Sequence, residues 1–372
     1  MNFEIDTKSL KEAIDTVNHA SSSGNLTPIL ENILINAQYK KVMLTSNNLE
    51  MAIEYVISEG VDVKSEGSFT VSSRFISSFI SLVNDEKINL ELLGNSSLGL
   101  KTPSSETKIK GIEASKFPLI PVFKQEYSFN MNSADLKKAI EKTIFSTASG
   151  NIRPTLAGIH LSINESEILF ASTDSFRLSE FKTKNKSNID KVISIIIPSK
   201  TALELSRILP ENAKVELFIS DNQILFTFGN IKLFSRLLNG HFPDHRVFFP
   251  KSYSTKGVIQ RQDLIQALKR INLISKENNF NTRMDFNSEN GIELSTGDTE
   301  IGAGRISLPA SIEGENAMIG LNSTYLIEAL NVIKDDYVSL DFETSLSPIM
   351  LRGITEKESD FEYKHIIMPL KI

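Results

Sequence analysis

The sequence predicts an α+β protein made of three tandem copies of one unit of roughly 125 residues. Three observations predict this class: a short motif recurs at a fixed spacing, amphipathic helices recur at nearly the same spacing, and the segments between them alternate in polarity. Each unit is expected to hold a strand, a helix, several strands, a second helix and several more strands. Alternating segments of this kind are typical of antiparallel sheets.

The most direct sign of repetition is a motif that occurs twice. The segment SGNLTPILENILI, which starts at Ser23, aligns with SGNIRPTLAGIHL, which starts at Ser149. Five identical pairs each lie 126 residues apart: Gly24–Gly150, Asn25–Asn151, Pro28–Pro154, Leu30–Leu156 and Ile33–Ile159. A tripeptide also recurs as KFP at 116–118 and HFP at 241–243, near the ends of the first two units.

The first helix of each unit follows a short alternating strand (NFEI, YSFNM or KGVIQ). Its apolar residues stand at the i, i+3, i+4 and i+7 spacing that places them on one helical face. The three faces are Leu10, Ala13, Ile14 and Val17; Leu136, Ala139 and Ile140; and Leu264, Ala267, Leu268 and Ile271.

The second helix of each unit also follows a strand (GSFTVSS, VISIIIPS or AMIGLNS). We expect one such helix with Ile76, Phe79, Ile80 and Val83 on its apolar face, and another with Leu326, Ala329, Leu330 and Ile333. KTALELSRIL at 200–209 is a less regular copy between them.

The remaining segments predict antiparallel strands and set the domain boundaries. KVMLTS at 41–46 and VELFISDNQILFTF at 215–228 alternate in polarity. Polar or proline-bearing stretches near 122–128 and 250–257 separate the units. We therefore expect domains at 1–122, 123–250 and 251–372.

Composition narrows the classes of function. The chain has 372 residues, no cysteine and a net charge of −6, so disulfides, thiolate metal sites and a globally basic nucleic-acid binder are excluded. The start lacks the apolar segment of a signal peptide, and no run approaches the length of a membrane helix. We expect a cytoplasmic protein without a membrane partner.

Basic residues recur on the expected helices outside their apolar faces. They are Lys8, Lys11, Arg74, Lys137, Lys138, Lys142, Lys200, Arg207, Lys269 and Arg270. Any one of them alone is most simply a solvated charge. Recurrence on equivalent helices, with Arg74 and Lys200 again 126 residues apart, favours a surface that faces a polyanion.

The triplicated unit, HFPDHR at 241–246, STDSFRL at 172–178 and the ending IIMPLKI together resemble the bacterial DNA polymerase III beta subunit family, the sliding clamps. The resemblance covers the whole chain in order. It implies a DNA clamp fold in which two chains join head to tail into a ring of six domains. Twelve helices would line the hole, and duplex DNA would pass through it without sequence readout. The implied role is a processivity factor for the polymerase.

The resemblance also implies partners and the residues that meet them. The partners are the polymerase III alpha subunit, the clamp loader and other replication and repair proteins, each inserting a short peptide into one pocket. The implied pocket residues are Leu156, Thr173, Ser175, Phe176, Arg177, Leu178, Pro243, Phe248, Asn322, Tyr325, Met368 and Leu370. We expect Arg177 to lay its stem along this cleft and offer donors to peptide carbonyls. Arg153 is implied to face DNA, and Leu273 and Ile274 are implied to lie at the dimer contact.

Three positions depart from the usual pattern of the family. Ser175 stands where a glycine is common, which predicts strain if the backbone there needs a positive φ. Phe176 stands where a histidine is common and makes the neighbourhood more apolar. Near Gly24 and Asn25, an arginine that touches DNA in some relatives is missing.

An enzyme is the main alternative. His241 and His245 stand four residues apart, a spacing that suits metal ligands on a helix, but Pro243 lies between them. Asp174 has a partner at Asn48, 126 residues earlier, which predicts a turn shared between units. We therefore expect a non-catalytic accessory subunit of DNA polymerase III without metal or cofactor.

Two further alternatives keep the repeat. A repeat scaffold that binds partner peptides but not DNA is one, and ring closure around DNA would distinguish it. A relative with two units per chain that forms trimers is the other. The third copy of the helix, around Leu264–Ile271, argues against it. A clamp is expected at the nucleoid during replication.

Overall fold

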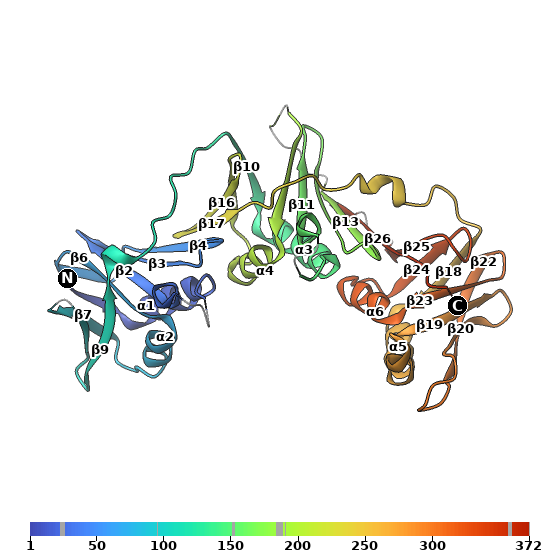
Figure 1. Cartoon of the computed structure of the whole chain (residues 1–372), viewed down its shortest axis with the longest axis horizontal. Coiled ribbons are helices and arrows are strands. Elements are labelled where there is room, and N and C mark those ends of the chain that lie inside the picture. Colours follow the sequence, from blue (N-terminus) through green and yellow to red (C-terminus); the bar gives the residue numbers. More distant parts are fainter. Residues whose placement is uncertain are drawn as a thin grey trace. The chain divides into compact units, whose positions relative to one another are not determined.

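A computed structural model of the chain describes residues 1–22, 27–94, 96–150, 153–183, 189, 191–355 and 359–371. Gly24, Asn25 and Asn151 of the repeated motif, and the missing-arginine position beside Gly24, lie outside these residues. The described residues hold six α-helices (Figure 1): α1 Thr7–Asn18, α2 Ser73–Ser81, α3 Ser133–Thr143, α4 Ser199–Ile208, α5 Arg261–Ser275 and α6 Ser323–Val332. In this part of the chain no helix is long and apolar enough to cross a membrane.

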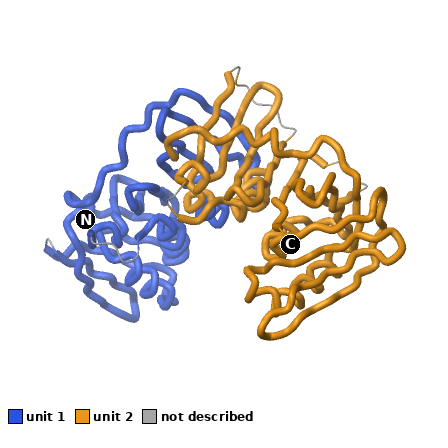
Figure 2. Tube along the Cα trace, turned by 45° about the vertical axis from the view of Figure 1, so that its right-hand side comes forward, with its two compact units in different colours: residues 1–134, 203–237 blue, residues 135–202, 238–372 orange. Residues whose placement is uncertain are grey.

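The folded chain divides into two compact units, which differ from the three sequence repeats and which Figure 2 colours separately. Unit 1 comprises residues 1–134 and 203–237, and unit 2 comprises residues 135–202 and 238–372. The segment 123–250, which we call the second repeat, therefore contributes strands to both units.

Unit 1 contains one antiparallel sheet of thirteen strands among the described residues. Their order is β10 (Tyr127–Asn132), β15 (Lys214–Ile219), β16 (Gln223–Phe228), β17 (Ile231–Arg236), β4 (Met51–Ile57), β3 (Lys41–Asn47), β2 (Asn32–Gln38), β6 (Gly67–Ser72), β9 (Glu106–Glu113), β8 (Ser97–Lys101), β7 (Lys87–Leu93), β1 (Asn2–Asp6) and β5 (Val61–Ser65).

Unit 2 contains two antiparallel sheets in its described part. The nine-stranded sheet has the order β14 (Ile193–Pro198), β11 (Gly158–Ile163), β12 (Ile168–Thr173), β13 (Arg177–Thr183), β26 (Phe361–Ile367), β25 (Ile349–Ile354), β24 (Tyr337–Phe342), β18 (Thr255–Gln260) and β22 (Ala310–Gly314). The four-stranded sheet has the order β21 (Arg305–Leu308), β20 (Gly291–Ser295), β19 (Asn281–Asn287) and β23 (Ala317–Asn322).

The six expected helices are all present, and their apolar faces are buried. Leu10, Ile14 and Val17 pack α1 against α2 and the sheet, and burial of each such side chain stabilises the fold by about 1.5–3 kcal/mol. Two of the three second-type helices, α2 and α6, end earlier than their apolar spacing suggested. Val83 and Ile333 lie just beyond the last residues of α2 and α6, and Ile333 is nevertheless buried.

Strand pairing joins consecutive repeats in the same way twice. The first and second repeats meet where β4 pairs with β17, with Ala52 opposite Phe234. The second and third repeats meet where β13 pairs with β26, with Leu178 opposite Ile366. Leu178 stands 126 residues after Ala52 in the sequence, so the two junctions use the same register of equivalent strands.

Candidate functional site

The loop between β12 and β13 is a turn that the first repeat copies closely. The Asp174 carboxylate accepts hydrogen bonds from the backbone N–H groups of Phe176 (2.9 Å) and Arg177 (3.0 Å). In the first repeat, the Asn48 side-chain oxygen accepts from the residues at the same positions, at 3.1 and 2.8 Å. The prediction that Asp174 and Asn48 share a structural role is therefore confirmed.

The backbone of this turn is left-handed at its second position. Ser175 has φ +82°, and its counterpart Leu49 has φ +73°. The side chains one position before Asp174 and Asn48 support both turns: the Thr173 hydroxyl accepts from Ser175 N–H at 3.0 Å, and Asn47 accepts from Leu49 N–H at 2.8 Å. Ser175 therefore meets the condition under which strain is predicted, and the conformation belongs to the repeat itself.

Arg177 is a buried centre of contacts within unit 2. Its side chain is 8% exposed, and Nε donates to the Asp174 carboxylate at 3.0 Å. Its other nitrogens donate to Glu328 of α6 and to the carbonyl of Phe145, which belongs to the 3-10 helix η3 (Ile144–Ser146). The guanidinium also stacks on the Tyr325 ring, 4.3 Å from its centroid.

This environment takes up most of the donors that we expected Arg177 to offer to peptide carbonyls. The guanidinium carries five N–H groups, and three of them are held by groups of the same chain. Arg177 therefore positions the turn against α6 and η3. Its stem still lines the neighbouring pocket.

A pocket of about 270 Å³ opens beside this turn in unit 2. It brings together eight of the twelve expected residues: Leu156, Thr173, Ser175, Arg177, Leu178, Pro243, Phe248 and Met368. Leu178 and Ile366 line it and belong, together with Met350, to a small buried cluster. Pro243 and Phe248 come from the segment that contains the 3-10 helix η5 (His245–Phe248).

The four other expected residues lie around the pocket without lining it. Asn322 caps α6 by accepting from the N–H groups of Thr324 and Tyr325, and Tyr325 stacks on Arg177. Phe176 is exposed, and its carbonyl accepts from Met368 N–H at 2.8 Å. The chain then continues to Leu370, whose N–H donates to Gly320 at 2.8 Å, so these residues hold the C-terminal segment in place.

Three lining residues were not expected in the pocket. Ile366 faces Leu178 across the β13–β26 pair, and a strand register of this kind is invisible in one sequence. Arg153, which the resemblance implies to face DNA, donates to the Ser175 hydroxyl at 2.5 Å and lines the pocket. The third is His245, considered above only as a metal ligand.

His245 is buried, and its Nε2 lies 2.8 Å from the Glu180 carboxylate. His241, by contrast, is exposed. Burial, and then the neighbouring His245, lowers the pKa of His160 to about 4, which leaves that ring neutral at neutral pH. No group of three or more metal-ligating side chains occurs in the described part of the chain.

The basic residues of the helices differ in exposure. Those exposed are Lys8, Lys11, Arg74, Lys200, Arg207, Lys269 and Arg270, and Arg207 pairs with Glu204 at 2.7 Å. Lys137 and Lys138 are half-buried, and the Lys138 ammonium lies 4.9 Å from the centroid of the Phe361 ring.

Lys142 does not belong to the DNA-facing set. Its side chain is 8% exposed, and its ammonium donates to the carbonyl of Val332 at 2.9 Å and lies over the Tyr363 ring at 4.6 Å. Burial lowers its pKa from 10.5 to about 8, partly offset by Asp335. The expectation for Lys142 is therefore corrected, because its charge is held inside unit 2.

Leu273 and Ile274, expected at the dimer contact, lie near the end of α5. Leu273 is 74% exposed, whereas Ile274 is half-buried. A single exposed leucine does not by itself indicate an interface. Ile301 is also exposed, and its N–H donates to Glu277, which follows α5 in the chain, so two exposed apolar side chains lie near this end of α5.

The comparisons with known proteins follow the three repeats. Models of the DNA polymerase III beta subunit match in order: the N-terminal domain over residues 1–121, the central domain over 130–244 and the C-terminal domain over 246–371. The beta sliding clamp of Bacillus subtilis is 28% identical over 380 residues and covers 100% of both chains. That of Staphylococcus aureus is 28% identical over 379 residues, covering 100% of this chain and 99% of the relative.

Solved structures give the same result. The DNA polymerase beta subunit of Streptococcus pyogenes superposes with a TM-score of 0.94 at 28% identity and full coverage of both chains. The sliding clamp of Bacillus subtilis gives a TM-score of 0.92 at 27% identity, covering 100% of this chain and 99% of that one. The fold is therefore the three-domain DNA clamp fold. The chain belongs to the DNA polymerase III beta subunit family, the beta sliding clamps.

Proposed function

We propose that this chain is a sliding clamp that closes into a head-to-tail homodimeric ring around duplex DNA and tethers the replicative polymerase. The observation that supports this most strongly is the repeated strand junction. The β4–β17 and β13–β26 pairs use equivalent strands in one register. A third junction of the same kind, between two chains, would need two further strands, and each chain has both.

The two strands of the third junction are β21 and β9. By their order in the repeats, β21 corresponds to β4 and β13, and it lies at the edge of its sheet. Likewise β9 corresponds to β17 and β26, and its residues 106–110 pair with β8 on one side only within the described chain. Unpaired strand edges are templates for pairing with another chain. Joining β21 of one protomer to β9 of its partner, twice, closes a ring of two chains.

The helices support the same assembly. At the first junction, His19 just after α1 contacts Glu204 of α4 at 2.6 Å, and at the second, Lys142 of α3 contacts Val332 of α6. The third junction would pair α5 with α2 of the partner. The exposed Leu273 of α5 would then meet Phe75 and Leu82, which are exposed on and just after α2. We propose these two residues as the first-domain side of the dimer contact.

DNA would be held by charge and by topology. The exposed lysines and arginines of the helices supply positive charge on a chain whose net charge is −6, and contacts of this kind carry no base information. Loose contacts, often bridged by water, permit sliding. We place the domains at 1–122, 123–250 and 251–372 and the working location at the nucleoid in the cytoplasm.

The pocket beside the 172–178 turn would bind a partner segment. Leu178, Phe248 and Met368 make it largely apolar, and methionine adapts to ligands of varied shape. The polymerase III alpha subunit, the clamp loader and repair proteins would use it in turn. Asp174 and Arg177 are committed to structural contacts, which supports a non-catalytic role.

The mass of the assembly tests ring closure. The account predicts a particle of two 41.5 kDa chains by light scattering at micromolar concentration. Leu273→Asp is expected to give single chains, because it places a charge in the apolar contact. Leu346→Asp is the matched control, since Leu346 is also 74% exposed in the third repeat. A wild-type particle of one or three chains would count against the proposal.

The pocket is tested with the polymerase III alpha subunit by surface plasmon resonance. Phe248→Ala is expected to weaken binding at least tenfold while the dimer mass stays unchanged. Val247→Ala is the control, because Val247 is exposed on the same short helix and does not line the pocket. Equal affinities for the two variants would reject the pocket assignment.

A further inference from the structure

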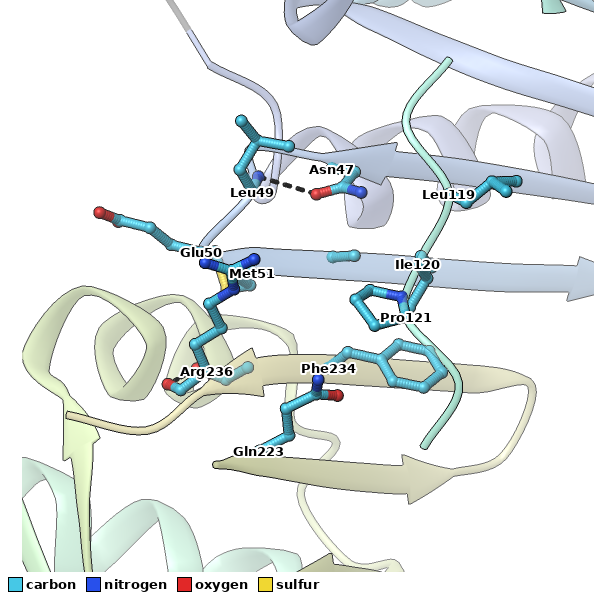
Figure 3. Close-up of a pocket in the computed structure, with 12 residues that line it drawn as sticks. Asn47, Leu49, Glu50, Met51, Leu119, Ile120, Pro121, Gln223, Phe234 and Arg236 are labelled. Atoms are coloured by element: carbon cyan, nitrogen blue, oxygen red, sulfur yellow. Dashed lines mark hydrogen bonds between the residues drawn. The ribbon is translucent and has the colours of Figure 1, made fainter. Parts of the chain in front are cut away.

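A second, smaller pocket lies in unit 1, where nothing in the proposed function places a ligand. It encloses about 60 Å³ (Figure 3). One wall is the loop and strand from Asn47 to Ala52, and another is the segment 119–121. The floor comes from Phe234, Ser235 and Arg236 of β17 together with Gln223 of β16.

This pocket is the repeat-related copy of the pocket beside the 172–178 turn. Ala52 pairs with Phe234 as Leu178 pairs with Ile366. Just beyond those pairs, Arg236 N–H donates to the carbonyl of Glu50 at 2.9 Å, as Met368 N–H donates to that of Phe176 at 2.8 Å. Both pockets are therefore lined by equivalent parts of the repeats: the turn, the strand pair and the segment that ends a repeat.

The substitutions between the two copies define what the small pocket accepts. Alanine replaces leucine at position 52, whereas the opposing residue becomes the larger Phe234, so the cavity has room for a short aliphatic side chain only. Arg236 takes the place of Met368. Figure 3 shows its side chain running toward Met51 while the Glu50 carboxylate points away. Its guanidinium has no hydrogen-bond or ion-pair partner among the described residues, so it is available to an incoming carboxylate.

The rim of the pocket carries two exposed leucines that the packing of the fold does not require. Leu49 is 51% exposed although it occupies a left-handed turn position, where a leucine is strained and a glycine or asparagine is not. Leu119 is 91% exposed on the opposite side. A copy that only completed the turn would be satisfied by polar residues at both places, whereas exposed apolar rims accompany binding surfaces.

We propose that this pocket is a second docking site, for an extended segment of a partner protein that carries one aliphatic side chain next to a carboxylate. The aliphatic group enters between Ala52 and Phe234, Leu49 and Leu119 cover it, and Arg236 binds the carboxylate. The choice of a partner segment rests on the function proposed for the larger pocket. With two unequal sites on one chain, one partner can occupy both sites or two partners can each occupy one.

Methionine methyl resonances report on the two sites separately. Met51 lines the small pocket and Met368 the large one, so selectively labelled dimer gives one signal for each. The probe is the peptide acetyl-Gly-Leu-Asp-Gly-amide. It is expected to shift the Met51 signal saturably, and Arg236→Gln is expected to weaken this binding about fivefold, the size of one partly exposed ion pair. Lys232→Gln, at an exposed position of the same strand, is the control and should change nothing.

The outcomes separate the two proposals. A Met368 shift without a Met51 shift overturns the second site and leaves the proposed function standing. A Met51 shift that survives Arg236→Gln unchanged overturns the role of the carboxylate. A Met51 signal that moves with protein concentration alone shows that a second copy of the chain occupies the site, and also overturns the inference. If the peptide shifts neither signal, the small pocket is not a docking site for an aliphatic side chain next to a carboxylate.

Discussion

Replacement of Arg177 by alanine is expected to destabilise unit 2 by about 3 kcal/mol. Removing one partner of a buried ion pair costs about 3–5 kcal/mol when both charges are deeply buried. Here the side chain of Arg177 is 8% exposed and that of Asp174 is 14% exposed, whereas Glu328 is 40% exposed and contributes little because of solvent screening. Loss of the stack on Tyr325 adds about 1 kcal/mol.

The free energy of unfolding is measured by urea titration, followed by circular dichroism because the chain contains no tryptophan. Arg177→Lys should recover about half of the loss, since lysine keeps the charge but not the planar fork. Arg207→Ala is the control: it breaks a 2.7 Å ion pair with Glu204 in which the arginine side chain is 53% exposed, and it should cost about 0.5 kcal/mol or less. A loss below about 1 kcal/mol for Arg177→Ala would refute the view that this residue fastens the turn to α6 and η3.

Three further predictions concern the turns and the buried lysine. Leu49→Gly should be neutral or stabilising by up to about 1 kcal/mol, because release of left-handed strain outweighs the added backbone entropy. Ser175→Gly releases the same strain but also removes the hydroxyl that accepts from Arg153, so it should be close to neutral. Thermal melts showing clear destabilisation by Leu49→Gly would contradict the strain. Asn48→Asp, which copies Asp174, should change the free energy of unfolding by less than about 0.5 kcal/mol, whereas Asn48→Ala should lower it by about 1–2 kcal/mol because two backbone N–H groups lose their acceptor. Equal stabilities of the Asn48→Asp and Asn48→Ala variants would count against the shared turn. The pKa of Lys142 is about 8 in the folded chain, against an ordinary value of 10.5. Between these pH values the unfolded chain binds more protons, so the free energy of unfolding should rise with pH there by up to roughly 3 kcal/mol. Lys142→Met should flatten that rise in urea titrations at several pH values, and an unchanged slope would exclude Lys142 as its source.

Periodicity predicted the fold well because each repeat carries its own local signals. The six helices follow from apolar spacing, and the shared turn of Asn48 and Asp174 follows from the offset of 126 residues. The positive φ at Ser175 was expected from a family comparison at that single position. Turns and helices are fixed by neighbours in sequence, which is why one chain suffices to find them.

The environment of individual side chains was less accessible. Lys142 stands at the same spacing as exposed lysines, yet its partner Val332 lies 190 residues later. Ile366 enters the pocket only through the register of β13 against β26. The small pocket in unit 1 depends in the same way on the pairing of β4 with β17. These contacts are set by strand pairing between distant segments, which no periodicity in the sequence encodes.

A closed ring that holds DNA by topology should leave the DNA only at a free end, so retention on circular and linear DNA tests ring closure. After loading by the clamp loader, the protein is measured on circular plasmid, on the same plasmid after linearisation, and on linear DNA whose ends are blocked by bound protein. The account predicts retention on the circle and on the blocked DNA, and rapid loss from the free-ended DNA. Equal loss from all three would contradict it and favour a scaffold that binds partner peptides without encircling DNA.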